Sequence, residues 1–292
     1  MNEVIVRLVG GLGNQMFQYA AGRAVAARNQ ASLILDLSWF GTDPERQYAL
    51  APFRIDARTR MDQAKKDAKF SWMQRFTGRV RRKLEFAGQG LPVFSERSFR
   101  YDADIESVRA PVILNGYFQS ERYFSSIRSL ITEQFSLQEE AKGLTAEMLT
   151  LIRASDAICV HIRRGDYVTN AEANAYHGTC ALEYYDKGLS ELGAGLRNPH
   201  CFVFSDDPLW VRENFKPSLP TTFVNIHGTQ EAHEDLRLMR ECQHFVIANS
   251  SLSWWGAWLG AGEGKRVVAP KLWFKNNKND TVDLIPSGWR RI

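Results

Sequence analysis

The chain has 292 residues, 44% of them apolar and 24% charged, which is typical of a globular protein with room for two domains. Its 37 Lys and Arg stand against 33 Asp and Glu, and a net charge of +4 is too small to predict nucleic-acid binding. No apolar run approaches the roughly 18 residues of a membrane span, and no C-x-x-C pair suggests a structural zinc site. The N-terminus shows no basic and apolar leader, which predicts a cytoplasmic protein.

The N-terminal part of the chain predicts a β-α-β unit. An apolar strand over 4–9 leads into a glycine-rich turn over 10–15, an alanine-rich helix over 16–28 and a second strand over 32–37. Units of this kind bind ligands beyond the carboxyl ends of their strands. The turn over 10–15 is therefore a candidate ligand loop.

Two interpretations of this glycine turn are open. Its G-x-G pattern, with Asp36 ending the next strand, resembles the start of a dinucleotide fingerprint and predicts a nicotinamide-dependent sugar oxidoreductase. Met16, however, occupies the third small position, where its bulk would hold helix and strand apart. Amides at the start of a helix suit sugar hydroxyls, which favours a loop that faces a sugar or a phosphate. The residues predicted to do so are Gly11, Gly13, Asn14 and Gln15.

Residues 58–83 are strongly basic, with ten Lys or Arg against Asp62 and Asp67. Apolar residues recur every three or four positions within this segment, which predicts an amphipathic helical insertion near 58–86. A helix packed on the core, with a solvated charged face, is one interpretation. The other is peripheral contact with an anionic membrane at its inner face.

Strands and helices alternate regularly in the second half of the chain, which predicts a parallel sheet with helices on both faces. We therefore expect an α/β fold with two domains, 1–153 and 154–292. The second domain's predicted strands cover 157–162, 201–204, 222–225, 244–248 and 266–269.

Three loops with complementary chemistry follow strands of the second domain. Loop 163–167 supplies two guanidinium groups, which grip phosphate in a fork. Loop 205–208 supplies two carboxylates that could accept hydrogen bonds from guanine. Loop 249–253 supplies three Ser hydroxyls at a helix N-terminus, where anions bind. Taken singly, each loop is explained as well by a surface Arg pair or a helix cap. Their occurrence at one sheet edge favours a site for a nucleoside diphosphate.

Five sequence motifs resemble a known family. Residues 161–167 (His-Ile-Arg-Arg-Gly-Asp-Tyr), 205–207 (Ser-Asp-Asp) and 249–258 (Asn-Ser-Ser-Leu-Ser-Trp-Trp-Gly-Ala-Trp) look like the three motifs of the alpha-1,2-fucosyltransferases, glycosyltransferase family 11. Residues 10–18 resemble the N-terminal signature of that family and 116–120 its middle one. Together the motifs extend over nearly the whole chain.

The resemblance implies a GT-B-like fold, with two Rossmann-like domains facing a cleft. It implies GDP-fucose as donor, held mainly by the second domain, a galactose-ended glycan as acceptor, and neither a metal nor a cofactor. By the motif match, Arg163 would contact the β-phosphate, while His161 and the acidic pair would lie toward guanine. The nucleotide-binding residues would be His161, Arg163, Arg164, Ser205, Asp206, Asp207, Asn249, Ser250, Ser251 and Ser253. His177 is added to the residues expected to face the sugar.

Transfer would release GDP as an anion while the fucosyl ring becomes positively charged. Arg163 and Arg164 would stabilise the charge that grows on the β-phosphate. Inversion at the fucose carbon would be helped by a general base, and four candidates stay open: Asp36, Asp166, Glu172 and His177. Asp166 is favoured because it lies in the motif. A nucleotide-sugar or glycan-binding protein without turnover is the alternative from another class.

Overall fold

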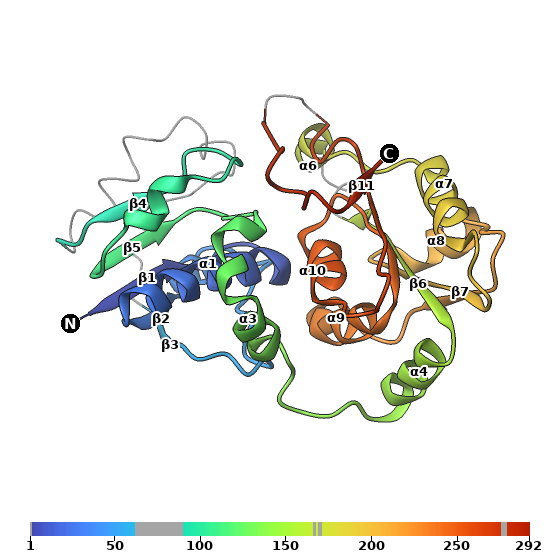
Figure 1. Cartoon of the computed structure of the whole chain (residues 1–292), viewed down its shortest axis with the longest axis horizontal. Coiled ribbons are helices and arrows are strands. Elements are labelled where there is room, and N and C mark those ends of the chain that lie inside the picture. The colour runs from blue at the N-terminus through green and yellow to red at the C-terminus, as the bar shows by residue number, and fades with distance from the viewer. Residues whose placement is uncertain (1, 62–89, 166–167, 169–170, 276–278) are drawn as a thin grey trace. The chain divides into compact units, whose positions relative to one another are not determined.

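A computed structural model describes residues 2–61, 90–165, 168, 171–275 and 279–292 (Figure 1). The chain divides into two compact units, Met1–Ser136 and Leu137–Ile292. In Figure 1 the first unit runs from blue to green, and the second continues from green to red.

The first unit is built on a parallel sheet with the strand order β3-β2-β1-β5-β4 within the described residues. Parallel strands are covered on both faces and are therefore apolar along most of their length, as β1 is. The strands are β1 (Glu3–Arg7), β2 (Ser32–Asp36), β3 (Arg58–Arg60), β4 (Val93–Ser95) and β5 (Val112–Asn115). The helices are α1 (Leu12–Asn29) and α3 (Arg128–Gln134), with short 3-10 turns η1 (Ser38–Gly41), η3 (Ala103–Ser107), η4 (Glu121–Tyr123) and η5 (Ser125–Ile127).

Helix α1 lies close against the sheet because it carries a glycine where the two meet. A Cβ atom on Gly22 would come within 2.3 Å of Val6 Cγ2 and 3.0 Å of Leu33 Cδ1. The helix begins at Leu12, four residues before the predicted start, so Gly13, Asn14 and Gln15 belong to its first turn.

Replacing Gly22 by alanine is expected to destabilise the protein by about 1–3 kcal/mol through overpacking against Val6. Alanine favours a helix interior over glycine by only about 1 kcal/mol, so the clash outweighs the gain. Chemical denaturation measures the difference, with Gly41→Ala as control, because a Cβ there would meet nothing within 4 Å. A Gly22→Ala variant as stable as the wild type would contradict this packing.

The second unit is built on a parallel sheet with the strand order β11-β10-β9-β6-β7-β8 within the described residues. Its strands are β6 (Asp156–Ile162), β7 (Pro199–Ser205), β8 (Thr221–Val224), β9 (His244–Val246), β10 (Val267–Ala269) and β11 (Arg290–Arg291). Its helices are α4 (Gly143–Arg153), α6 (Ala171–Tyr176), α7 (Leu182–Gly193), α8 (Pro208–Asn214), α9 (Ala232–Glu241) and α10 (Ser251–Leu259), with the 3-10 turn η6 (Thr229–Glu231). The alternating strands and helices predicted from the sequence are confirmed.

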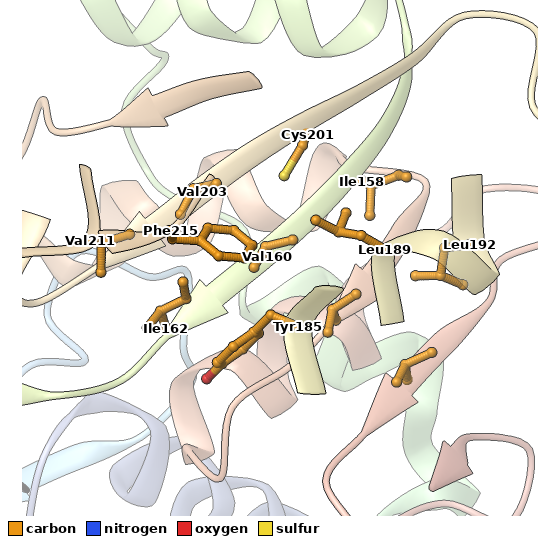
Figure 2. Packing of buried hydrophobic residues seen from close by; sticks show 12 residues of the cluster. Ile158, Val160, Ile162, Tyr185, Leu189, Leu192, Cys201, Val203, Val211 and Phe215 are labelled. Carbon is orange, nitrogen blue, oxygen red and sulfur yellow. The ribbon is translucent and has the colours of Figure 1, made fainter. Parts of the chain in front are cut away.

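Side chains from one face of this sheet form a buried apolar cluster, which Figure 2 shows. Alternate residues of β6 and β7 face α7, which contributes one residue per helical turn. The labelled members are Ile158, Val160, Ile162, Tyr185, Leu189, Leu192, Cys201, Val203, Val211 and Phe215. Cys159 points to the opposite face of β6, where its thiol meets Cys242 at the end of α9. Helices therefore pack on both faces of β6.

The division after Ser136 differs from the expected one at 153/154. Helix α4 packs against β6 and α9, so it belongs to the second unit although it precedes that unit's first strand. The predicted helix over 121–135 is also broken. It consists of two 3-10 turns and the short α3.

Most of the basic segment predicted over 58–83 lies outside the described residues; the structure describes only its residues 58–61, of which Arg58–Arg60 form β3. Across the part of the chain that the structure describes, no helix combines the length and the apolarity needed to cross a membrane.

Candidate active site

Two neighbouring strands of the second unit deliver the arginine loop and the acidic loop to the same sheet edge. β6 and β7 are parallel, with Ile162 opposite Ser205, so the loops that follow them start side by side. Arg163 Nη1 lies 2.9 Å from Asp206 Oδ2, and the Arg164 N–H donates to Asp206 Oδ1 at 2.8 Å. Asp206 thus holds both the side chain of one arginine and the backbone of the next.

This arrangement requires glycine at position 165. A Cβ there would lie 2.1 Å from Asp206 Oδ2 and 2.9 Å from its Cγ. Only the missing side chain lets the Asp206 carboxylate reach the loop.

Arg164 is held from two sides. Its Nε lies 3.2 Å from Asp207 Oδ2, and its guanidinium carbon lies 3.3 Å from the centre of the Trp210 ring. Asp207 also caps α8 by accepting from the Trp210 N–H at 3.4 Å, while the Ser205 hydroxyl accepts from the Asp207 N–H at 3.0 Å. The carboxylates expected to meet guanine are therefore engaged by the two arginines and a helix end. Ser205 is engaged with this loop's backbone.

His161 is buried in β6, directly before the arginine loop, with an exposed fraction of 3%. Burial lowers its pKa to about 4, the Asp206 carboxylate acts in the opposite direction, and Arg163 adds to the lowering. The imidazole is therefore neutral near pH 7.

We expect His161 to make the protein less stable in mild acid. Between pH 6.5 and 4 the unfolded chain binds a proton that the folded chain does not, so stability falls as the pH drops through that window. The full effect is about 3 kcal/mol. An NMR titration of the His161 ring measures this directly, and a midpoint near 6.5 would disprove it.

The polar residues at the start of α10 have two kinds of role. Asn249 is buried, and its amide donates to the backbone carbonyls of His177, Gly178 and Trp273 at 3.0–3.2 Å. The buried Ser253 hydroxyl donates to the carbonyls of Ala248 and Ser250.

Asn249 and Ser253 therefore fix segments of the chain around the start of α10, and their predicted contact with a nucleotide stays a prediction. Ser250 is the N-cap of α10 without a side-chain capping bond, and Ser251 begins the helix. Behind them Trp254, Trp255 and Trp258 are buried and set the position of the helix end.

The glycine turn of the first unit is organised by buried amides. Gln15 is fully buried; its side chain donates to the carbonyls of Gly10 and Gln47 and accepts from the Ala49 N–H. Its side chain is therefore engaged within the first unit, and its predicted contact with a sugar stays a prediction. Gly13 is also buried, within the first turn of α1. Asn14 is partly exposed, and its Oδ1 accepts from Gln119 at 2.8 Å.

The chain matches a known sequence family over almost its whole length. The family model described as Glycosyl transferase family 11 matches residues 2–291. The chain belongs to this family. It is therefore a glycosyltransferase, and the resemblance noted from its motifs is confirmed.

Relatives of this family 11 glycosyltransferase have named activities. It is 36% identical to an alpha-1,2-colitosyltransferase of Escherichia coli, over 100% of the chain and 99% of the relative. It is 31% identical to the O-antigen biosynthesis glycosyltransferase WbnK of Escherichia coli, over 95% of the chain and 97% of the relative. It is also 26% identical to galactoside alpha-(1,2)-fucosyltransferase 2 of Sus scrofa, over 88% and 70%.

Among solved structures, the family 11 enzyme resembles NodZ alpha-1,6-fucosyltransferase soaked with GDP-fucose. The TM-score is 0.50 at 16% identity, over 93% of this chain and 95% of that one. The likeness concerns the fold, and the predicted GT-B-like class with two Rossmann-like domains is confirmed.

The second unit of the family 11 enzyme also has a pocket of about 380 Å³ that the sequence did not reveal. His177 and Asn249 line it together with two cations, Lys271 and Lys275. Both lysines follow β10, at the edge where the other loops emerge. Their position after the last predicted strand was the signal that could have found them.

Of the four base candidates, the structure informs two. Asp36 is 3% exposed and pairs with Arg60 Nη2 at 3.1 Å, which also removes it as a free ribose acceptor for a nicotinamide cofactor. His177 lines the pocket. Asp166 and the side chain of Glu172 lie outside the described residues.

The acidic residues of the family 11 enzyme show no ready metal centre in the described ranges. No three His, Cys, Asp or Glu side chains there are grouped as metal ligands. Asp102 and Asp104, whose D-x-D spacing is of a kind that can hold a metal ion, are both bonded to Arg97.

Proposed function

We propose that this chain transfers L-fucose from GDP-fucose to the 2-hydroxyl of a galactose-ended glycan, with inversion and without a metal. Family membership and the named activities of the relatives support the reaction. The E. coli relative named for O-antigen biosynthesis supports a role in a bacterial surface polysaccharide. We propose a cytoplasmic enzyme that meets the inner membrane face through residues 58–83.

The observation that carries this proposal is the pair of arginines held by carboxylates at the edge of the second unit's sheet. Departure of GDP places negative charge on the β-phosphate, and fixed guanidinium groups stabilise that charge without reorganising at the moment of reaction. Arg163 is 24% exposed at its side chain and Arg164 17%, so Arg163 is the better placed to meet a ligand. We assign the β-phosphate contact to Arg163 and a supporting role to Arg164.

The proposed donor site continues along the same edge. The first turn of α10, beginning at Ser251, presents backbone N–H groups of the kind that bind phosphate. His161 is neutral, and we propose that it supports the arginine loop on the side that would face guanine. The proposed acceptor side is the first unit, through Gly11 and Asn14. Asp166 stays the proposed general base.

A second candidate for the donor sugar comes from the relative that shares the most identity among those described above. Because that protein is named a colitosyltransferase, a GDP-colitose donor is the alternative to GDP-fucose. The reaction type and the site residues are the same under both.

The deciding experiment offers the purified full chain GDP-fucose or GDP-colitose with a panel of galactosides. We expect an alpha-1,2-linked product, identified by NMR, whose yield is unchanged by EDTA. Another linkage would refute the proposed regiochemistry, and loss of product in EDTA would refute metal independence. Absence of product with every pair, while GDP binds, would favour a binding protein without turnover.

A further inference from the structure

Glu96 places a carboxylate against the backbone of a loop in the first unit. It directly follows β4, and its N–H donates to the Asn115 carbonyl at 3.0 Å. Its Oε2 accepts from the N–H groups of both Tyr117 and Phe118, at 2.8 and 3.0 Å. Its Oε1 is buried as well. The side chain thus acts as an external clamp on the loop that follows β5.

The loop that follows β5 has a strained backbone conformation, which the hydrogen bonds to Glu96 help to maintain. Phe118 is fully buried and has a φ of +53°, in the left-handed region that residues other than glycine rarely adopt. A Cβ on Gly116 would lie 2.5 Å from Glu96 Cβ, so glycine is required for the carboxylate to approach. Local strain of this kind persists where surrounding contacts fix it, and it gathers at functional loops.

The loop after β5 is bonded to the first turns of α1, the helix that follows β1. Gln119 donates to Asn14 Oδ1 at 2.8 Å, and Gln18 donates to the Gly116 carbonyl at 3.3 Å while accepting from the Val9 N–H at 2.9 Å. β1 and β5 are parallel neighbours, so both segments leave the same edge of the sheet. We call residues 9–14 and 116–119 together the acceptor platform.

Burial and hydrogen bonding act in opposite directions on the pKa of Glu96. Burial raises its pKa to about 7. Hydrogen bonds from the two backbone N–H groups and from the Tyr123 hydroxyl favour the carboxylate and act in the opposite direction. Asp102, which is itself bonded to Arg97, acts in the same direction as burial and disfavours the carboxylate. The side chain therefore changes its protonation state near neutral pH.

We propose that Glu96 is a positioning residue that holds the acceptor platform in its binding geometry, and that it does so more firmly as the carboxylate than as the acid. The inference rests on the proposed function, which gives the first unit the acceptor. The physical reason is that hydrogen bonds to an ionised acceptor are about twice as strong as neutral ones. Glu96 itself need not touch either substrate.

The test compares Glu96→Gln with Glu133→Gln, a change at an exposed carboxylate on α3 of the same unit. At pH 8, Glu96→Gln is expected to raise the acceptor KM about tenfold, the loss of one charge-assisted bond, and to leave the donor KM within about twofold. Glu133→Gln should change neither. The split between the two KM values separates a platform effect from general damage to the fold.

The pH dependence supplies a second readout. The wild-type acceptor KM should fall as the pH rises from 6 to 8, because the carboxylate forms, whereas the Glu96→Gln value should stay level. Protection of the Tyr117 and Phe118 amides against hydrogen exchange should rise over the same range in the wild type only. This measurement needs no turnover.

Each result has one meaning. An active Glu96→Gln enzyme with an unchanged acceptor KM, or wild-type amide protection that does not change with pH, overturns the role of Glu96. A wild type that transfers no sugar overturns the proposed function instead. In that case amide protection alone tests whether Glu96 holds the loop: protection that depends on pH supports this role, and constant protection refutes it.

Discussion

Replacing Arg163 by alanine is expected to slow sugar transfer by about 100- to 1,000-fold while the protein stays folded. Removing one donor that stabilises charge in a transition state typically costs about 3–4 kcal/mol of barrier. Arg163 lies at the sheet edge with its guanidinium fixed by Asp206, so its charge is already positioned before the donor arrives. The fall should therefore appear mainly in kcat.

Two further variants make the Arg163 prediction specific. Arg163→Lys keeps the charge but loses the two-pronged fork, so we expect it to recover only part of the rate. Arg212→Ala removes an exposed arginine on α8 and should leave the rate unchanged. Circular dichroism and the melting temperature check the fold. A folded Arg163→Ala protein with near-normal kcat would remove Arg163 from the mechanism.

Replacing Gly165 by alanine is expected to cost about 100-fold in rate, although it adds a single methyl group. That methyl group would occupy the position of the Asp206 carboxylate, which must move and release Arg163 Nη1 and the Arg164 N–H. A shift of about 1 Å in groups that position a substrate can cost this much. Overpacking adds a stability loss of about 1–3 kcal/mol.

Gly288→Ala is the matched control for Gly165→Ala, because a Cβ at that glycine of the second unit would meet nothing within 4 Å. It should retain full activity and stability. The decisive comparison is kcat at a temperature where all variants are folded. Equal rates for Gly165→Ala and the wild type would show that the loop does not depend on the Asp206 contact.

The parts of the fold that follow from local pattern could be predicted from the sequence. The apolar run before His161 identified β6, and the change to Arg163 and Arg164 marked the end of that strand. The pairing of these arginines with Asp206 and Asp207 could not be predicted. Two carboxylates after a strand can accept hydrogen bonds from a purine as well as from a guanidinium group. Only the parallel register of β6 and β7 brings the two loops together.

The roles of the buried amides were hidden for a related reason. Gln15 and Asn249 lie at the sheet edges where the sequence predicts ligands and carry groups that suit a ligand, but each bonds to backbone distant in sequence, at Gln47 and at Trp273. A local pattern does not contain these partners. Glu96 was missed because it lies between predicted elements in a stretch without a motif, and its partners belong to the loop after β5.

The pairing of Arg163 with Asp206 has a consequence for the end of the catalytic cycle. A carboxylate that occupies Arg163 before the donor binds also competes for it afterwards. Under the proposed reaction, Asp206 stays paired with Arg163 while GDP departs, so no bare cation is left behind. This partial neutralisation favours fast product release and weak inhibition by GDP, and weakening the Asp206 contact would lengthen the time that the nucleotide stays bound.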